Sequence, residues 1–431
     1  MIQEAASRAR KVSILMSSLS TEVKNLALAK IAEDLQANER KIVEANIADL
    51  ERAKKDRVKL SLIERLEFDS STLQTAIAGV MSLIQLPDPV GRTLSAMELD
   101  TGLELYKVSC PIGVLGIIFE SRPDALVQIS TLALKSGNAV LLKGGSEAAN
   151  TNRVLADVIV ESSTKAGLPE GWMAHLETRE DVKAMLALED HIDLIIPRGS
   201  NEFVKYIMNN TRIPVLGHAE GICHVYVDSD ADLDKAVRIA FDAKCQYPAA
   251  CNAMETLLVA EQVAREFLPR IKAQYDKAGV ELRGDNRTRK IIECKPASEA
   301  DWRTEYSDLI LSIKAVRNVD EAIDHINTFG SHHTDAIVTE NPATAKQFLG
   351  LVDSADVFWN SSTRFSDGFR YGLGAEVGIS TNKIHARGPV GLEGLVTYKW
   401  KLIGHGQIVA DYSAAKGKKF THRVLDKECP I

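Results

Sequence analysis

The sequence has no long hydrophobic run and no excess of positive charge. Its apolar stretches, such as the one that ends at Phe119, are far shorter than the ~20 residues that span a membrane. The 52 Lys and Arg residues against 59 Asp and Glu residues give a net charge of −7, whereas a general nucleic-acid surface requires a basic stripe. The N-terminal segment also lacks the apolar core of a signal peptide. We therefore expect a cytoplasmic protein with neither a membrane nor a nucleic-acid partner.

Cysteine is scarce, and its spacing argues against a disulfide or zinc framework. The 431 residues include six Cys, and no two of them form a CxxC pair. Four of them stand singly in apolar or featureless surroundings, as inert packing thiols do: Cys110, Cys223, Cys294 and Cys429. We expect no bound metal.

Helical periodicity dominates the first part of the chain and then gives way to alternating strands and helices. Apolar residues recur with helical spacing up to about residue 85, and segment 86–92, with two Pro and one Gly, ends this helical layer. Beyond it, short apolar runs such as 114–119 alternate with amphipathic helical patterns, and 213–217 is expected to be one more strand. A second series begins near residue 224. Such alternation is typical of parallel β-α-β units, so the sequence predicts an α/β protein with two open-sheet layers and a cleft between them.

Cys251 is the cysteine whose position suits a reactive thiol. It follows a predicted helix in a loop of small residues that contains Pro248, and a predicted strand comes after it. A thiol on such a loop can reach a cleft, and the backbone N–H groups of Cys251 and Asn252 could stabilise a developing oxyanion. Cys245, on the preceding helix, is expected to be a packing residue. From these residues alone, a nucleophile and an inert thiol are equally good interpretations of Cys251.

Two strand-to-helix turns combine glycine with a hydroxyl group and a nearby cation. The first contains Lys143, Gly145 and Ser146, and the second contains Arg198, Gly199 and Ser200. Glycine allows a close backbone approach, and a helix start favours anions. Neither turn is a Walker A loop or a GxGxxG fingerprint, and each alone would pass for an ordinary turn. Two of them on adjacent units favour a nucleotide site.

The segment 361–391 is rich in glycine and serine and poor in large apolar residues. Its cationic side chains are Arg364, Arg370, Lys383, His385 and Arg387. A loop of this length without function would be unusual, and in an acidic protein its cations indicate an anionic substrate. The alternative is a solvated loop.

Histidines near the predicted strands divide into two groups. His332 and His333 come directly before a strand, and one of them could face the cleft. His218 and His224 have no acidic or Cys partner at metal-ligand spacing, so we expect them to be hydrogen-bonded structural residues.

Several of these segments together resemble one family. The loop PAACNAMETLL around Cys251, FESRPDA (119–125), GSHHTDAIVTE (330–340) and the run from Arg364 to Trp400 are similar to the γ-glutamyl phosphate reductases. These are NADPH-dependent enzymes of proline biosynthesis in the aldehyde dehydrogenase superfamily. The similarity extends over nearly the whole chain in the order of the family's motifs.

The resemblance implies an aldehyde-dehydrogenase-like α/β fold with two Rossmann-like open-sheet domains plus an oligomerisation flap. We expect a cofactor-binding domain over residues 1–225, with a flap hairpin at about 97–110 inserted in it. A catalytic domain that carries the Cys nucleophile is expected over 226–390, followed by C-terminal oligomerisation strands and a tail over 391–431.

For catalysis, the resemblance implies that Cys251 is the nucleophile. The oxyanion-hole asparagine of ordinary aldehyde dehydrogenases aligns with Ser121, and Asn252 is a further candidate for that role. Their general-base glutamate, which activates water to hydrolyse a thioester, aligns near Val215 or Leu216, so this chain lacks it. Glu220 is close in sequence but out of register. An enzyme that reduces an acyl phosphate has no use for that base.

For the cofactor, the resemblance places Lys143 at the adenosine ribose and Gly145 in the same turn. Ser146 stands where many NAD-specific members have a glutamate, which would repel a 2′-phosphate, so NADPH is the expected cofactor; Glu147 is adjacent. Gly199 and Ser200 match the second cofactor loop, and Glu305 matches the glutamate at the nicotinamide ribose. The substrate-binding residues implied are Arg122, His333, Ser361, Arg364 and Arg387.

The implied reaction is attack of the Cys251 thiolate on L-glutamyl 5-phosphate, loss of phosphate, and reduction of the thioester to L-glutamate 5-semialdehyde. Arg122, His333 or the positive end of a helix could lower the pKa of the thiol. The alternatives are an oxidising semialdehyde dehydrogenase and a catalytically inactive binding protein. The expected partners are L-glutamyl 5-phosphate, a second copy of the chain in a homodimer or larger homo-oligomer, and glutamate 5-kinase.

Overall fold

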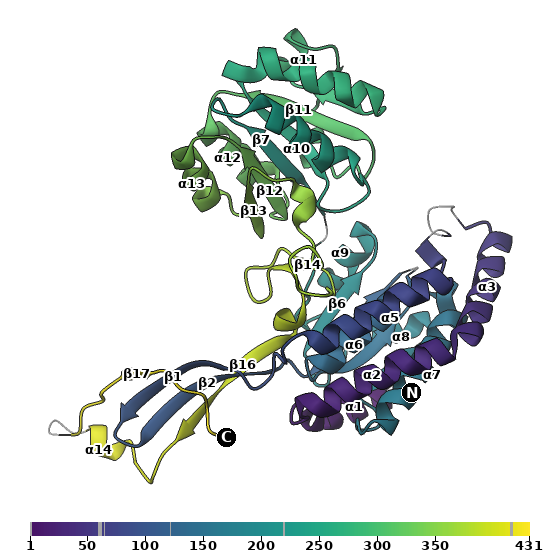
Figure 1. Ribbon diagram of the computed structural model, residues 1–431, viewed down its shortest axis with the longest axis vertical. Coiled ribbons are helices and arrows are strands. Elements are labelled where there is room, and N and C mark those ends of the chain that lie inside the picture. The colour runs from purple at the N-terminus through teal and green to yellow at the C-terminus, as the bar shows by residue number, and fades with distance from the viewer. Residues whose placement is uncertain (1, 59–62, 64, 121, 219, 414–416) are drawn as a thin grey trace.

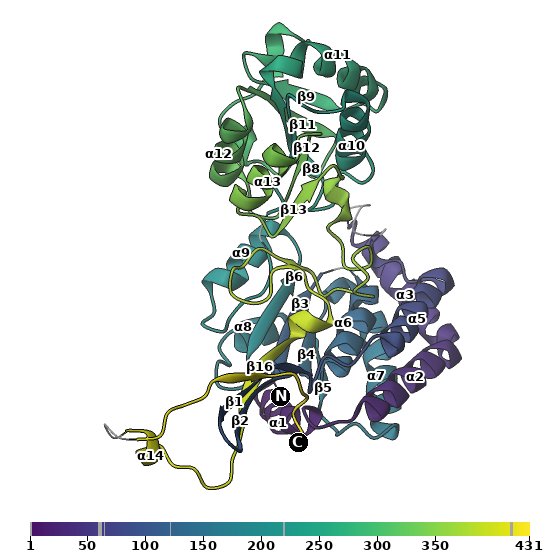
Figure 2. The same ribbon diagram turned by 60° about the vertical axis from the view of Figure 1, so that its left-hand side comes forward.

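The computed structural model describes residues 2–58, 63, 65–120, 122–218, 220–413 and 417–431. It contains two parallel sheets, an antiparallel flap sheet and an N-terminal layer of helices (Figures 1 and 2). In the described residues we find no helix that is long and apolar enough to cross a membrane.

The first parallel sheet has four strands in the order β5-β4-β3-β6. Its strands are β3 (Val114–Phe119), β4 (Ala139–Lys143), β5 (Met173–Leu176) and β6 (Leu194–Arg198). The helices that connect or follow these strands are α6 (Pro123–Lys135), α7 (Ala149–Lys165), α8 (Arg179–Met185) and α9 (Asn201–Asn209). Every residue of β3 and β4 is buried, as expected for a parallel sheet covered on both faces.

The N-terminal helices pack on this first sheet. They are α1 (Ile2–Met16), α2 (Thr21–Ala37), α3 (Glu39–Lys55) and α5 (Ser70–Gln85). Leu28 and Ile31 of α2 belong to the same apolar core as Ile117 of β3 and Leu126 of α6. The helical residues up to about 85 are therefore a layer of the first unit and share its core.

The second parallel sheet has seven strands in the order β10-β9-β11-β8-β7-β12-β13. Its strands are β7 (Cys223–Val227), β8 (Met254–Ala260), β9 (Glu281–Gly284), β10 (Lys295–Pro296), β11 (Ile310–Val316), β12 (Thr334–Val338) and β13 (Asp356–Trp359). The helices on its two faces are α10 (Leu233–Cys245), α11 (Glu261–Lys277), α12 (Val319–Phe329) and α13 (Pro342–Leu351). Each face closes its own apolar core.

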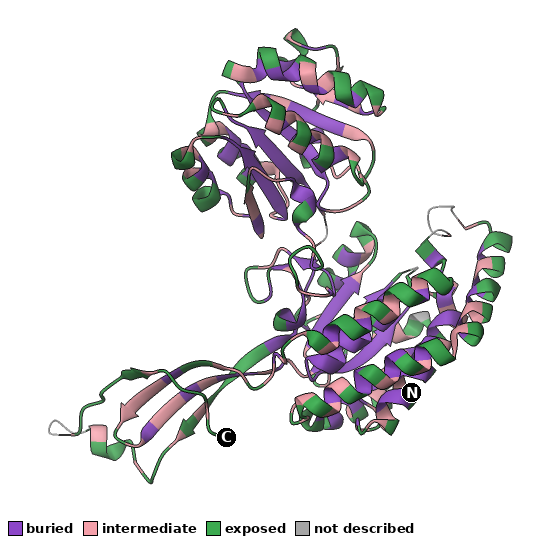
Figure 3. Ribbon diagram, viewed as in Figure 1, coloured by how far each residue is buried: buried purple, intermediate pink, exposed green. Residues whose placement is uncertain are grey.

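The flap sheet joins segments that are distant in sequence. Its four strands, in the order β16-β2-β1-β17, pair antiparallel: β1 (Thr93–Asp100), β2 (Leu103–Pro111), β16 (Val396–Ile403) and β17 (Arg423–Leu425). It projects from the body of the molecule (Figure 1), and most of its surface is exposed or half-buried (Figure 3). The described residues also form the short pair β14 (Ile379–Ser380) and β15 (Gly388–Pro389), the helix α14 (Ala410–Ser413) and several single turns of 3-10 helix.

The predicted strand at 213–217 and two predicted boundaries differ from the structure. Residues 213–217 are not a strand, because the segment makes only one bridge, between Val215 and Ile195, before it leaves the sheet edge, and Pro214 has no N–H to extend the ladder. The domain boundary predicted at residue 225 falls inside β7, which belongs to the second sheet. The flap hairpin is also longer than 97–110 at both ends. The division of the chain into domains stays a prediction.

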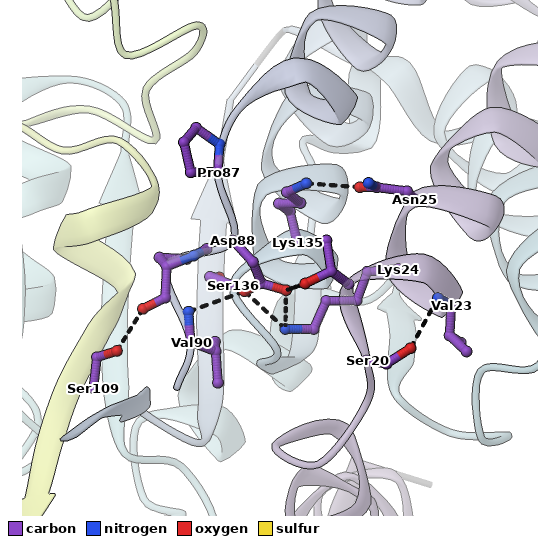
Figure 4. Close-up of polar contacts among 12 residues, drawn as sticks. Ser20, Val23, Lys24, Asn25, Pro87, Asp88, Val90, Ser109, Lys135 and Ser136 are labelled. Carbon is purple, nitrogen blue, oxygen red and sulfur yellow. Dashed lines mark hydrogen bonds and ion pairs between the residues drawn. The ribbon is translucent and has the colours of Figure 1, made fainter. Parts of the chain in front are cut away.

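A polar cluster joins the helical layer to the start of the flap (Figure 4). The side chain of Lys24, on α2, is fully buried, and its Nζ lies 3.0 and 3.1 Å from the two carboxylate oxygens of Asp88. Lys135, on α6, is also buried and donates to Asn25 Oδ1 over 2.6 Å. Burial lowers the pKa of Lys135. Asp88 lies in the segment of two prolines and a glycine that separates α5 from β1, so this contact fixes the point where the flap begins.

Candidate active site

Cys251 lies in the loop between α10 and β8, at one wall of a cavity of about 370 Å³. Residues of both units line this cavity. Glycine at position 221 is required beside the loop, because an added Cβ would lie 2.0 Å from the carbonyl oxygen of Cys251. Cys223, at the start of β7, donates its thiol to the same carbonyl over 3.3 Å. The backbone of the Cys251 loop is therefore held against the segment that leads into β7.

The cavity lies between opposite edges of the two sheets. Phe119 and Arg198 are the last residues of β3 and β6, so the first sheet contributes its carboxyl edge. Cys251 precedes β8, which lies beside β7 with Cys223 paired to Met254, so the second sheet contributes its amino edge. Ligands of open α/β sheets bind at carboxyl ends of strands, and the second unit closes this site from the other side.

Two histidines lie beside the Cys251 thiol. Cys251, His218 and His333 each offer one ligand atom, and these three atoms lie within 4.8 Å of one another. The rings of His218 and His333 meet edge to face with centroids 4.7 Å apart. His333 is buried and its Nδ1 lies 2.8 Å from Thr334 Oγ1. His218 has the hydrogen bond expected of a structural residue, from its Nδ1 to the carbonyl oxygen of Ile379 over 2.8 Å. It also lies beside a cysteine, which its spacing in the sequence did not indicate, because the parallel order of β8, β7 and β12 brings the residues that precede these strands to one edge.

His224 has the structural role expected of it. Its backbone N and its Nδ1 both lie 2.8 Å from Asp335 Oδ1, on the neighbouring strand β12. Both side chains are fully buried. This pair fixes the register between β7 and β12.

Charged groups surround the far side of the cavity. Burial lowers the pKa of Arg198 and raises that of Glu376, and the two groups oppose these shifts in each other. Glu376 also accepts a hydrogen bond of 2.8 Å from the backbone N–H of Gly368. Glu305, from the second unit, accepts a 2.7 Å hydrogen bond from Asn201 at the start of α9 in the first unit. This bond ties the two walls of the cavity together.

A second, wider cavity of about 1000 Å³ adjoins the first. The two cavities share Phe119, Glu120 and Ser200 in their walls, so they adjoin along this wall, and we call the two together the cleft. The turn after β4 lines the wider cavity with Lys143, Gly144, Gly145, Ser146 and Glu147. The cleft therefore runs from this turn to Cys251.

The turns along this cleft are fixed by hydrogen bonds. Arg52, on α3, donates to the carbonyl oxygens of Ser146 over 2.9 Å and Glu147 over 3.0 Å. Lys143 donates to the carbonyl oxygen of Gly144. Ser200 caps α9, and its backbone N–H donates to Glu120 Oε2 over 3.0 Å. These bonds hold the two glycine turns at the wall of the cleft.

The structure brings most of the predicted site residues to this cleft. Cys251, Arg122, Gly199, Ser200 and Glu305 line the narrow cavity. Lys143, Gly145, Ser146 and Ser200 line the wide one, and His333 lies beside Cys251. Ser121 lies outside the described residues.

Five predicted residues are not among the described residues that line either cavity: Asn252, His333, Ser361, Arg364 and Arg387. Asn252 is buried, and its Nδ2 donates to the carbonyl oxygen of Ser366 over 2.7 Å. Arg364 is buried, with its Nε 2.9 Å from Gln246 Oε1. Arg387 pairs with Asp353 over 3.1 Å, away from the cavity. Their functional roles stay predictions, and for Asn252 and Arg364 the structure shows contacts that position the Cys251 loop.

Sequence reasoning did not identify Arg52, Glu120 and Glu376, which line the cleft, or Gly221, which lies beside the Cys251 loop. The glycines on both sides of His218 indicate a tight turn before a strand, and this was the available signal for that histidine. Nothing in the spacing of the others indicates the cleft, because each comes from a different element.

Comparison with known proteins agrees with this architecture. The family model described as the aldehyde dehydrogenase family matches residues 1–290. A structure of glyceraldehyde-3-phosphate dehydrogenase GapN from Methanocaldococcus jannaschii, complexed with NADP, shares the fold with a TM-score of 0.66 at 18% identity, over 94% of each chain. The chain belongs to the aldehyde dehydrogenase family and is an oxidoreductase.

More similar relatives define the branch of that family. A γ-glutamyl phosphate reductase of Pelotomaculum thermopropionicum is 62% identical over 430 residues, which cover 100% of this chain and 99% of the relative. The crystal structure of the γ-glutamyl phosphate reductase of Thermotoga maritima has a TM-score of 0.92 at 43% identity and covers 94% of this chain and 99% of that one. Within the aldehyde dehydrogenases, the chain is a member of the γ-glutamyl phosphate reductases.

Proposed function

We propose that the enzyme reduces L-glutamyl 5-phosphate to L-glutamate 5-semialdehyde and phosphate with NADPH, the second step of proline biosynthesis from glutamate. The relatives are named γ-glutamyl phosphate reductases, which supports this activity. The observation that supports it here is the position of Cys251 at the narrow end of a cleft whose wide end is lined by the turn after β4. Such a cleft can hold a dinucleotide with one end at the thiol.

The residues of the wide cavity fit a phosphorylated nucleotide. Arg52, Lys143 and Lys183 line it, and Gly144 and Gly145 leave no side chain between the backbone and the cavity. Three acidic groups also line it: Asp56, Glu120 and Glu147. Because these carboxylates repel a phosphate, binding of a 2′-phosphate requires that the cations lie closer to it than the carboxylates do. When bound, NADPH supplies the hydride that converts a thioester into an aldehyde.

In the narrow cavity, the chain's own residues carry the acyl transfer. The Cys251 thiolate attacks the γ-acyl carbon, the bond to the phosphate oxygen breaks, and a thioester forms. The backbone N–H groups of Cys251 and Asn252 stabilise the oxyanion, while the Asn252 side chain anchors the loop through Ser366. Arg122 and Arg198 supply positive charge toward the anionic substrate. We retain Ser361, Arg364 and Arg387 as substrate ligands that would require movement of the segment that carries them.

The surroundings of the thiol favour reduction over hydrolysis. Leu216, near the position of the missing general base, is buried and lines the cavity with an apolar side chain. The general base that activates water in ordinary aldehyde dehydrogenases has no counterpart at this position, so hydrolysis of the thioester loses its assistance. The thioester therefore persists until hydride or phosphate resolves it.

This persistence gives the decisive experiment. Enzyme incubated with freshly prepared glutamyl phosphate and no NADPH should release about one phosphate per Cys251 in a burst and gain the mass of a glutamyl group on that residue. Cys251→Ala should abolish both, whereas Cys245→Ala, which removes a half-buried thiol from the preceding helix, should keep both. Steady phosphate release without an adduct would contradict the proposal.

The proposal extends to partners and location. We propose a homo-oligomer joined through the flap, an association with glutamate 5-kinase, which makes the unstable substrate, and a cytoplasmic location. The six free cysteines support a reducing compartment.

A further inference from the structure

The orientation of His218 determines which of its nitrogens can accept a proton. Its Nδ1 lies 2.8 Å from the carbonyl oxygen of Ile379, in β14. A carbonyl oxygen only accepts hydrogen bonds, so the proton of a neutral ring is on Nδ1 and the lone pair is on Nε2. The ring is therefore oriented by a backbone group, as a base beside a nucleophile must be.

The state of the ring also suits a base. Burial lowers the pKa of His218, opposed by the Ile379 carbonyl, so the neutral imidazole is the form present near neutral pH. The charged or titratable groups that face it are Arg198, Glu305, Glu376, Cys251 and His333. Arg198 favours the neutral ring, and Glu305 and Glu376 favour the protonated ring, so a proton received from the thiol has two carboxylates to stabilise it.

We propose that His218 is the proton acceptor for the Cys251 thiol, a catalytic role that rests on the proposed acyl transfer to that cysteine. The S–H bond breaks and its proton goes to His218 while the sulfur forms the C–S bond. The C–O bond to phosphate then breaks, and the same proton goes to the departing phosphate. When the later tetrahedral adduct collapses to the aldehyde, its electron pair returns to the sulfur, and a proton from solvent restores the thiol.

His333 is the competing candidate. Its Nδ1 faces Thr334 Oγ1 at 2.8 Å and Cys223 Sγ at 3.7 Å, and both groups can donate or accept. Its tautomer is therefore not fixed by a partner, and its Nε2 has no hydrogen-bond partner among the described residues. The His333 ring contacts the His218 ring edge to face, and this contact supports the His218 ring beside the thiol.

The first test measures the thiol itself and needs no substrate. Alkylation of Cys251 by iodoacetamide, followed by peptide mass spectrometry from pH 6 to pH 9, reports its reactivity. The wild type should stay reactive below the ordinary thiol pKa of about 8.5. His218→Asn should move the rise in reactivity to higher pH, because its amide nitrogen can replace Nδ1 at the Ile379 carbonyl but offers no base. His332→Asn is the control, because His332 faces Asp353 and has a φ of 60°, which Asn tolerates.

The second test measures turnover. His218→Asn should lower kcat/KM for glutamyl phosphate by about 10²–10⁴-fold, the usual contribution of a general base, with KM for NADPH unchanged. His218→Ala should lose the same activity, and added imidazole should restore part of it. All assays need a chelator, because one thiol and two imidazoles are also a donor set for zinc.

The outcomes separate this proposal from the proposed function. Unchanged alkylation and turnover in His218→Asn, with Cys251→Ser inactive, would overturn the role of His218 and leave the thioester route standing. A shifted profile in His333→Gln but not in His218→Asn would also overturn it and transfer the role to His333. Reductase activity in Cys251→Ser would instead refute the thioester route itself.

Discussion

At the scale of single residues, the wide cavity is lined both by cations that attract a phosphate and by carboxylates that repel it. Lys143 ends β4 and lines the cavity, and Glu147 lies in the same turn, three residues after Gly144. An added Cβ on Gly145 would lie 2.0 Å from Glu147 Oε1, so this carboxylate lies against the turn. The preference between NADPH and NADH therefore depends on the cations that reach the 2′-position.

We predict that Lys143→Ala weakens NADPH binding far more than NADH binding, because a lysine at the 2′-phosphate interacts with a group that NADH lacks. A charge-assisted contact of this kind is worth about 1.5–3 kcal/mol, or roughly 10- to 150-fold in affinity. Fluorescence titration with both cofactors measures it. Lys165→Ala, which removes an exposed lysine paired with Glu161, serves as the control. Equal losses for the two cofactors would place Lys143 at the part that they share.

At the scale of elements, an ionic clasp holds the segment around β14 and β15. Asp353 lies 2.6 Å from Lys383 Nζ and 3.1 Å from Arg387 Nη2. The hydrogen bond from Lys383, followed by that from Arg387, holds the pKa of Asp353 below its usual value. The clasp therefore ties the C-terminal end of α13 to the segment that also positions His218 through Ile379.

The clasp predicts a pH dependence. Because the pKa of Asp353 is lower in the folded state, its contribution is present above the unfolded value of about 3.9 and is lost as pH falls through the folded value. Hydrogen exchange of residues 380–389, corrected for intrinsic rates, should stay slow from pH 7 to about pH 4 and accelerate as the pH falls further. In Asp353→Asn it should be fast throughout. Asp367→Asn is the matched control, since Asp367 pairs only with Arg370 among the ion pairs described. Equal exchange in wild type and Asp353→Asn would show that the clasp contributes nothing.

The polar cluster around Lys24 and Asp88, where the flap begins, gives a stability prediction (Figure 4). Asp88→Asn should lower the free energy of unfolding by about 3–5 kcal/mol, because it leaves the fully buried Lys24 without its carboxylate. Urea unfolding measures this change. Glu44→Gln, which breaks an exposed helical pair with Arg40, should cost less than about 1 kcal/mol. A similar small loss for Asp88→Asn would mean that water or other groups solvate Lys24.

At the scale of the whole molecule, the flap exposes large apolar side chains to solvent. Tyr398, Trp400 and Leu402 alternate along the edge strand β16 and are 48%, 56% and 58% exposed. Lys107 Nζ lies 3.7 Å from the centre of the Tyr398 ring. An exposed edge strand with large apolar side chains favours pairing with another chain.

We predict that the protein is a homodimer or larger and that Trp400→Glu dissociates it, because the substitution places a charge in the apolar contact. Sedimentation at micromolar concentration measures the change. Met81→Glu, on the exposed face of α5, should leave the assembly intact. A monomeric wild type under these conditions would contradict this prediction.

Much of the architecture could be predicted from local sequence. The change from helical spacing to short apolar runs located both sheets, because buried parallel strands need continuous apolar residues. The loop of small residues indicated Cys251 as a candidate site residue, and the glycine turns indicated the residues that form the wall of the wide cavity. The segment 213–217 was mistaken for a strand because its apolar residues have the right composition, while its single bridge to β6 depends on the neighbouring sheet edge.

The sequence by itself determined which residues can do chemistry, and only the tertiary structure decided which of them meet. The neighbourhood of His218, Cys251 and His333 follows from the order β8-β7-β12. Parallel pairing aligns the amino ends of strands that lie far apart in the chain, and no spacing rule records that order. The structure likewise separated Arg364 and Arg387 from the cavity, because Gln246 and Asp353 already bind their guanidinium groups. Local sequence patterns determine the helices and strands, because backbone preferences and the burial of apolar side chains act over neighbouring residues. A site depends on contacts between elements that are distant in the sequence.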